Sequence, residues 1–168
     1  MVATYSLPAY QGFPNSPFPL LVYAGALERT LDSETLACTF EQRFSKNHWP
    51  PAWRNGVFAY HHYHATAHEA LGVFSGAAAV QFGGPSGITL EVAAGDLVVI
   101  PAGVSHKRIT TQGALGIVGA YPQGQQPDRV CPPDEQPGDQ GVLNTVPNHD
   151  PISGANGVLC EIWTSALG

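Results

Sequence analysis

The amino-acid sequence predicts an all-β fold, a sandwich or barrel of short strands. Apolar runs of four to eight residues recur between clear turn signals, which is typical of strands joined by tight connections. The chain holds 19 glycines and 15 prolines, while charged residues make up only 12%, a balance that suits many turns better than a helical bundle. Its 168 residues fit one domain, so we predict a single unit over residues 1–168.

The first 55 residues are expected to form an extended arm, one strand and one helix. Residues 1–19 are rich in proline, and residues 20–24 form an apolar run. Asp32 and Ser33 are favourable residues for a helix N-cap. Apolar residues then recur at helical spacing over residues 34–46, which predicts one N-terminal α-helix packed on the rest of the domain. Pro50 and Pro51 end this region, and a connector follows as far as residue 55.

Residues 56–121 alternate between strand and turn patterns. The segment GGPSG at residues 83–87 is a strong turn signal, and Pro101-Ala102-Gly103 is another. The expected strands are 57–63, 70–75, 77–82, 88–92, 97–100, 105–110 and 114–121.

The last 47 residues differ in composition from the rest of the chain. Residues 122–157 contain seven prolines together with many Gln, Asp and Gly residues, which predicts a long irregular segment rather than a second domain. Residues 158–164, VLCEIWT, are apolar, and we expect them to form a closing strand that returns to the β structure.

Charge and composition exclude several classes of function. The net charge is −6, and the seven Lys and Arg residues are scattered, so a nucleic-acid partner is not expected. No apolar run approaches the ~20 residues that a membrane span needs, and the N-terminus lacks the basic and apolar regions of a secretory signal. We therefore expect a cytoplasmic protein. The three cysteines form no CxxC pair, which argues against a zinc knuckle or a redox pair.

A histidine-rich window at residues 56–76 carries the chemistry of the chain. His62 and His64 are two residues apart, so on an extended strand both imidazoles point to one face, together with Tyr60. Glu69 follows after a break that can turn the chain back. Two imidazoles and a carboxylate from neighbouring strands are suitable ligands for a divalent transition metal, and His106 is the candidate for a fourth.

Two spaced motifs in this region resemble those of the cupin family. The pattern G-x5-H-x-H-x4-E-x6-G is met by Gly56, His62, His64, Glu69 and Gly76. The pattern G-x5-P-x-G-x2-H-x3-N is met by Gly95, Pro101, Gly103 and His106, with Thr110 in place of the final Asn. The sequence segments HHYHATAHEALGVFSG, VIPAGVSHK and GAYPQGQ are similar in particular to those of YjlB-like cupins.

This resemblance implies a double-stranded β-helix, the cupin jelly-roll barrel, with a metal held inside it. Carried over residue by residue, the metal ligands are His62, His64, Glu69 and His106. Such a donor set suits Fe, Mn, Ni, Cu or Zn and leaves coordination positions open on an octahedral ion. The family commonly forms dimers, so a homodimer is expected, with a small molecule as ligand or substrate.

The sequence leaves the function of such a site open between two classes. One is a small-molecule metalloenzyme, a dioxygenase or an isomerase, with Tyr60, His68 and Arg108 as candidate acid, base or anchoring residues. The other is a non-catalytic metal-binding or ligand-binding protein, such as a sensor. Structural roles compete for the same side chains. The pattern favours His61 and His68 as buried core histidines and Tyr60 as a packing residue, and Arg108 is also compatible with a solvated strand end.

Overall fold

The computed structural model describes residues 1–133, 135 and 141–168. Its elements, in chain order, are β1 (Val2–Tyr5), β2 (Leu20–Tyr23), α1 (Ser33–Lys46), β3 (Pro51–Asn55), β4 (Glu69–Phe82), β5 (Ile88–Ala93), β6 (Leu97–Ile100), β7 (His106–Ala120), a short 3-10 helix η1 (Gly141–Asn144) and α2 (Val158–Ser165).

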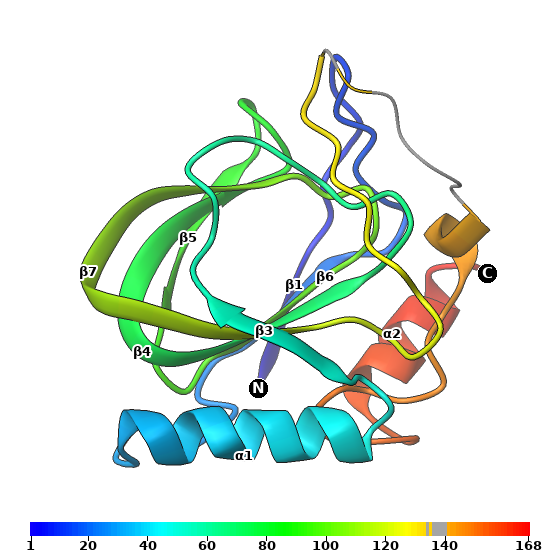
Figure 1. Ribbon diagram of the computed structural model, residues 1–168. Helices are drawn as coiled ribbons and strands as arrows, with labels where there is room; N and C mark the ends of the chain where they lie inside the picture. The colour runs from blue at the N-terminus through cyan, green and yellow to red at the C-terminus, as the bar shows by residue number, and fades with distance from the viewer. Residues whose placement is uncertain (134, 136–140) are drawn as a thin grey trace.

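The strands form one antiparallel sheet that curls into a jelly-roll barrel (Figure 1). Their order is β1-β2-β6-β4-β7-β3, and β5 pairs with β4 beside this path. β4 is the central strand, because its first residues pair with β6, its last residues pair with β5, and β7 follows it along its length. The predicted all-β barrel is therefore confirmed.

Two long bent strands replace four of the predicted short ones. Residues 70–75 and 77–82 belong to the single strand β4, and residues 105–110 and 114–121 merge into β7. Gly76 lies within β4 at a positive φ of 66°, where the register with β7 shifts. A glycine at such a position makes a bulge, so the strand bends and continues instead of turning back.

The structure differs from the prediction on both sides of residue 56: the predicted connector is a strand, and the predicted strand is irregular. Residues 51–55 form β3, which pairs with β7. Residues 57–63, predicted as a strand, form an irregular segment held by isolated contacts. His62 bridges to His106, Tyr63 bridges to Val130, and the Phe58 carbonyl accepts from the Arg108 amide at 2.9 Å. Since these contacts go to different segments, no continuous ladder forms.

Helix α1 begins as predicted and covers the outside of the barrel (Figure 1). The carboxylate of Asp32 accepts from the Thr35 amide at 2.9 Å, which caps the helix N-terminus. Phe40 packs directly on Gly72 of β4, where a Cβ atom would lie 2.6 Å from the Phe40 ring. The glycine therefore allows the close approach of helix and sheet, and their apolar residues share one core.

The predicted closing strand at residues 158–164 is wrong, because these residues form helix α2. Leu159 and Trp163 are the buried residues of the helix, and their spacing of four places them on one helical face. The Trp163 indole donates to the Pro19 carbonyl at 3.0 Å, which ties the helix to the segment before β2. An apolar stretch of this length is compatible with either element, and packing decided for the helix. No helix in the described part of the chain has the length and apolarity to cross a bilayer.

Candidate metal centre

The candidate site lies where β4 begins, β6 ends and β7 begins. Glu69 is the first residue of β4 and pairs with Ile100, the last residue of β6. The turn after Ile100 contains Gly103, whose positive φ of 92° reverses the chain toward His106. The segment before β4 then crosses this end of the barrel, and His62 exchanges backbone hydrogen bonds with His106 at 3.4 and 2.9 Å.

Three of the predicted ligands come together as a cluster of imidazoles. One nitrogen from each of His62, His64 and His106 lies within 4.8 Å of the others. His62 and His106 are 3% and 2% exposed, and the His64 side chain is 11% exposed. The Nε2 atoms of His64 and His106 lie 3.3 and 3.1 Å from Oε2 of Glu69. The predicted carboxylate therefore stands beside two of the three histidines.

Backbone carbonyls fix the tautomer of all three histidines. Nδ1 of His62 faces the Tyr60 carbonyl at 3.0 Å, Nδ1 of His106 faces the Val104 carbonyl at 3.3 Å, and Nδ1 of His64 faces the Asp128 carbonyl. A carbonyl oxygen only accepts, so each Nδ1 carries the proton and donates it. In the neutral imidazole, the lone pair is then on Nε2, which is the arrangement that metal-binding histidines adopt.

Glu69 contributes a buried oxygen that lacks a donor. Oε1 accepts from the Tyr121 hydroxyl at 3.2 Å, and that hydroxyl in turn accepts from the Trp53 indole at 3.0 Å. Oε2 is buried with no hydrogen-bond partner, although two histidine nitrogens are within 3.3 Å of it. Lone pairs face one another across these short distances, so a cation or an added proton is needed to offset the repulsion.

The pKa values of the cluster also show that positive charge between these groups is favourable. Burial raises the pKa of Glu69, but His64 and His106 more than offset this and hold that pKa well below its usual range. Burial lowers the pKa of His64, but the Glu69 carboxylate outweighs burial, so the pKa is raised. His62 has no contact with the carboxylate among the described hydrogen bonds and ion pairs, and burial together with His106 lowers its pKa to about 3.

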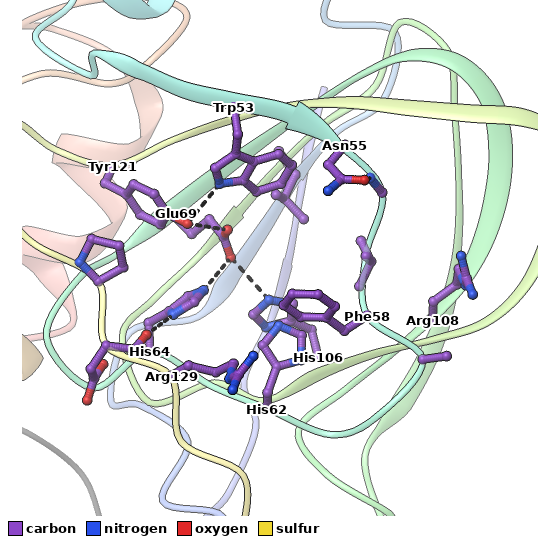
Figure 2. A pocket seen from close by; sticks show the side chains of 16 residues that line it. Trp53, Asn55, Phe58, His62, His64, Glu69, His106, Arg108, Tyr121 and Arg129 are labelled. Carbon is purple, nitrogen blue, oxygen red and sulfur yellow. Dashed lines mark hydrogen bonds and ion pairs between the residues drawn. The ribbon is translucent and has the colours of Figure 1, made fainter.

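A pocket of about 530 Å³ opens onto this cluster (Figure 2). This volume is within the range of small-molecule sites. The walls combine apolar side chains with a few polar and charged groups. The lining residues are Trp53, Asn55, Gly56, Val57, Phe58, Ala59, His62, His64, Glu69, Leu71, His106, Arg108, Tyr121, Pro127, Asp128 and Arg129.

The three predicted acid, base or anchoring residues occupy different places. Arg108 lines the pocket. Tyr60 is 40% exposed and outside the lining, and its hydroxyl accepts from Arg129 at 3.2 Å. His68 is fully buried and does not line the pocket, and both of its ring nitrogens bond to backbone groups. This is the geometry of the structural role that the sequence also allowed, and His61 likewise packs edge-on against Phe13 outside the pocket.

Several pocket residues escaped the sequence-based prediction, and among them are four with aromatic or polar side chains. Trp53 and Asn55 lie in the segment interpreted as a connector, and Arg129 lies in the proline-rich tail. Tyr121 falls at the end of a predicted strand, and the sequence assigns it no role, although GAYPQGQ contributes to the family resemblance. Their approach to the histidines depends on contacts across the barrel, for which the sequence has no local signal.

Comparisons with known proteins agree with the predicted resemblance. The uncharacterized protein YjlB of Bacillus subtilis (strain 168) is 38% identical over 166 residues, which cover 95% of each chain. No family model matches the chain.

Two solved structures match the chain at low similarity. Procruciferin, an 11S globulin from Brassica napus, gives a TM-score of 0.39 at 22% identity, and an 11S globulin from Wrightia tinctoria gives 0.36 at 20% identity. Each comparison covers 46% of this chain, and the chain spans about a fifth of the length of each globulin.

Proposed function

This chain belongs to the family of YjlB, and we propose that it is a cupin that binds a divalent transition metal and acts on a small molecule. The proposed ligands are His62, His64, His106 and Glu69. The pocket above them would hold the small molecule.

The convergence of four lone-pair donors supports this proposal above all. Three carbonyl-oriented imidazoles present Nε2 toward one another, and Glu69 adds a buried oxygen with no hydrogen-bond donor. A cluster of core histidines that served only packing would satisfy its second nitrogens with protein donors or acceptors. Here those nitrogens face each other and a carboxylate, which is favourable only when positive charge lies between them.

The donor set narrows the class of metal and of chemistry. Imidazole nitrogens with one carboxylate suit Fe, Mn, Ni, Cu or Zn. When bound, such an ion supplies a Lewis acid or a centre for dioxygen activation, and four protein ligands leave positions open on an octahedral ion. The Tyr121 hydroxyl would hold the Glu69 carboxylate in place. The side chains of Trp53, Leu71 and Phe58 would shield the bound small molecule from water.

Metal analysis of the purified protein tests the ligand assignment. The wild type is expected to hold close to one equivalent of transition metal, whereas His64→Ala and Glu69→Gln lose most of it. His149→Ala is the matched control, because it removes a histidine outside the pocket and should leave the metal content unchanged. Near-stoichiometric metal in both site variants would overturn the assignment.

Substrate screening tests whether the site is catalytic. The Fe(II)-loaded protein is incubated with small diketones, thiols and phenols while oxygen uptake and product NMR are followed. Oxygen consumption would indicate a dioxygenase, and a rearranged product without oxygen uptake would indicate an isomerase. Neither signal across the panel would contradict catalysis and favour the alternative, a metal-binding or ligand-binding sensor.

A further inference from the structure

We propose that the ligand of this pocket is a small organic acid, whose acid group is bound by Arg129 and attracted by the charge of Arg108. The inference rests on the proposed function, because it assigns a substrate class to the same site. It is carried by two arginines, the carboxylates near them and the apolar walls of the pocket.

Arg129 is held beside the histidine cluster by two aromatic rings. Its guanidinium donates to the Tyr60 hydroxyl at 3.2 Å and lies over the Phe58 ring at 5.8 Å. These two rings stack at 5.0 Å, and each also contacts the His62 ring, at 5.1 and 5.5 Å. The guanidinium and the proposed metal ligand His62 therefore contact the same two aromatic rings. The remaining N–H groups of its fork have no hydrogen-bond partner in the described part of the chain.

Arg108 is a second cation on the pocket wall. It follows His106 by two residues on β7, so both side chains leave the strand on the same face. The residue is partly buried, and its guanidinium makes no hydrogen bond or ion pair with any described residue. In Figure 2, Phe58 lies between Arg108 and the three histidines, whereas Arg129 lies next to the histidines. The two arginines therefore line different parts of one pocket. A partly buried cation without a counter-ion is costly, and an anionic ligand would relieve that cost.

The pocket carboxylates are already engaged elsewhere. Asp128 Oδ1 accepts from the Ala65 amide at 2.7 Å and from the Thr66 amide at 3.1 Å, which turns it toward that loop. Glu69 faces His64 and His106. With a divalent cation on the histidines, the positive charges lining the pocket exceed the negative ones.

The remaining pocket walls favour a ligand with an apolar organic framework over an inorganic anion. Trp53, Val57 and Leu71 offer apolar surface, and the volume of about 530 Å³ accommodates an aromatic ring with substituents. An acid of this size can place one end at the metal and its charged group at an arginine, which binds carboxylates with a planar fork of donors.

A matched pair of probes tests the inference by calorimetry on the Zn²⁺-loaded protein. Isophthalate has two carboxylates on a benzene ring, and 3-carbamoylbenzoate replaces one of them with an uncharged amide. The wild type is expected to bind isophthalate at least tenfold more tightly. Arg129→Gln should lose this preference, Arg108→Gln should reduce it less, and Arg129→Lys should retain part of it.

The control is Arg43→Gln, which removes the same charge from α1, outside the pocket. It should keep the full preference for isophthalate. Equal binding of the two probes by the metal-loaded wild type, binding of neither, or an undiminished preference in a folded Arg129→Gln variant would overturn the inference while the proposed metal site stands. Failure of the wild type to bind metal would instead overturn the proposed function.

Discussion

His64 and His68 lie four residues apart, yet the barrel gives their imidazoles opposite environments. His64 donates from Nδ1 to a backbone carbonyl and turns Nε2 toward other lone pairs. In His68, Nδ1 accepts from the Ala102 amide at 2.8 Å, so Nε2 carries the proton and donates to the Thr145 carbonyl at 2.8 Å. The first ring keeps one nitrogen for an added cation, whereas the second has none to offer.

The packing around the two rings differs in the same sense. His68 contacts the rings of Phe18 and Trp163, at centroid distances of 6.0 and 4.8 Å, and burial lowers its pKa to about 4. His64 lies beside a carboxylate at the wall of a pocket. Burial alone therefore does not identify a functional histidine. The number of ring nitrogens that protein groups already satisfy separates the proposed metal ligand from the structural residue.

Substitution of His68, and of the carboxylate beside His64, should break the comparison most strongly. His68→Ala leaves a cavity and two buried backbone groups without partners, so we expect a loss of roughly 3 kcal/mol or more of unfolding free energy in the metal-free protein. Glu69→Gln, which keeps the shape of the side chain, should abolish metal binding and change that value by less than His68→Ala does. Urea unfolding with metal analysis checks both. Equal destabilisation by the two variants would remove the distinction between the regions.

The acid dependence of stability should sharpen the comparison. An unfolded histidine titrates near pH 6.5, and His68 in the folded protein titrates near 4. As the pH falls, the unfolded chain therefore binds the proton before the folded protein does. The contribution of His68 to the free energy of unfolding is complete above pH 6.5 and declines as the pH falls toward 4, by up to about 3 kcal/mol. His68→Gln, which does not titrate, should flatten this part of the curve in metal-free protein. Parallel curves for the wild type and the variant would contradict the assignment.

The smallest expected effect concerns the hydrogen bond that orients the site carboxylate. Tyr121→Phe removes the donor to Glu69 Oε1 and should weaken metal binding by about tenfold, as for other groups that orient metal ligands. A competition titration with a chelator measures this change. Tyr5→Phe, which removes a hydroxyl outside the pocket, serves as the matched control and should bind metal as the wild type does. Unchanged affinity in Tyr121→Phe would show that the carboxylate needs no such support.

Local patterns predicted much of the fold and the centre of the site. The cap at Asp32, the helix after it and the strand at residues 97–100 depend on neighbouring residues, and all three are present. The spacing of His62, His64 and His106 predicted a group of imidazoles that the barrel does bring together. The prediction failed for α2, where a short apolar run fits either element, and for the segment 57–63, where bridges to several partners replace a ladder.

By itself, the sequence determined which residues could bind a metal, because residue type and spacing are written along the chain. Only the tertiary structure decided that one nitrogen of His64 stays open and that neither nitrogen of His68 does, since this depends on the carbonyls of Asp128 and Thr145, some 60 to 80 residues away in the chain. The same holds for Tyr121 at Glu69 and for Arg129 beside His62. These contacts arise from closure of the barrel, and closure has no local signature in the sequence.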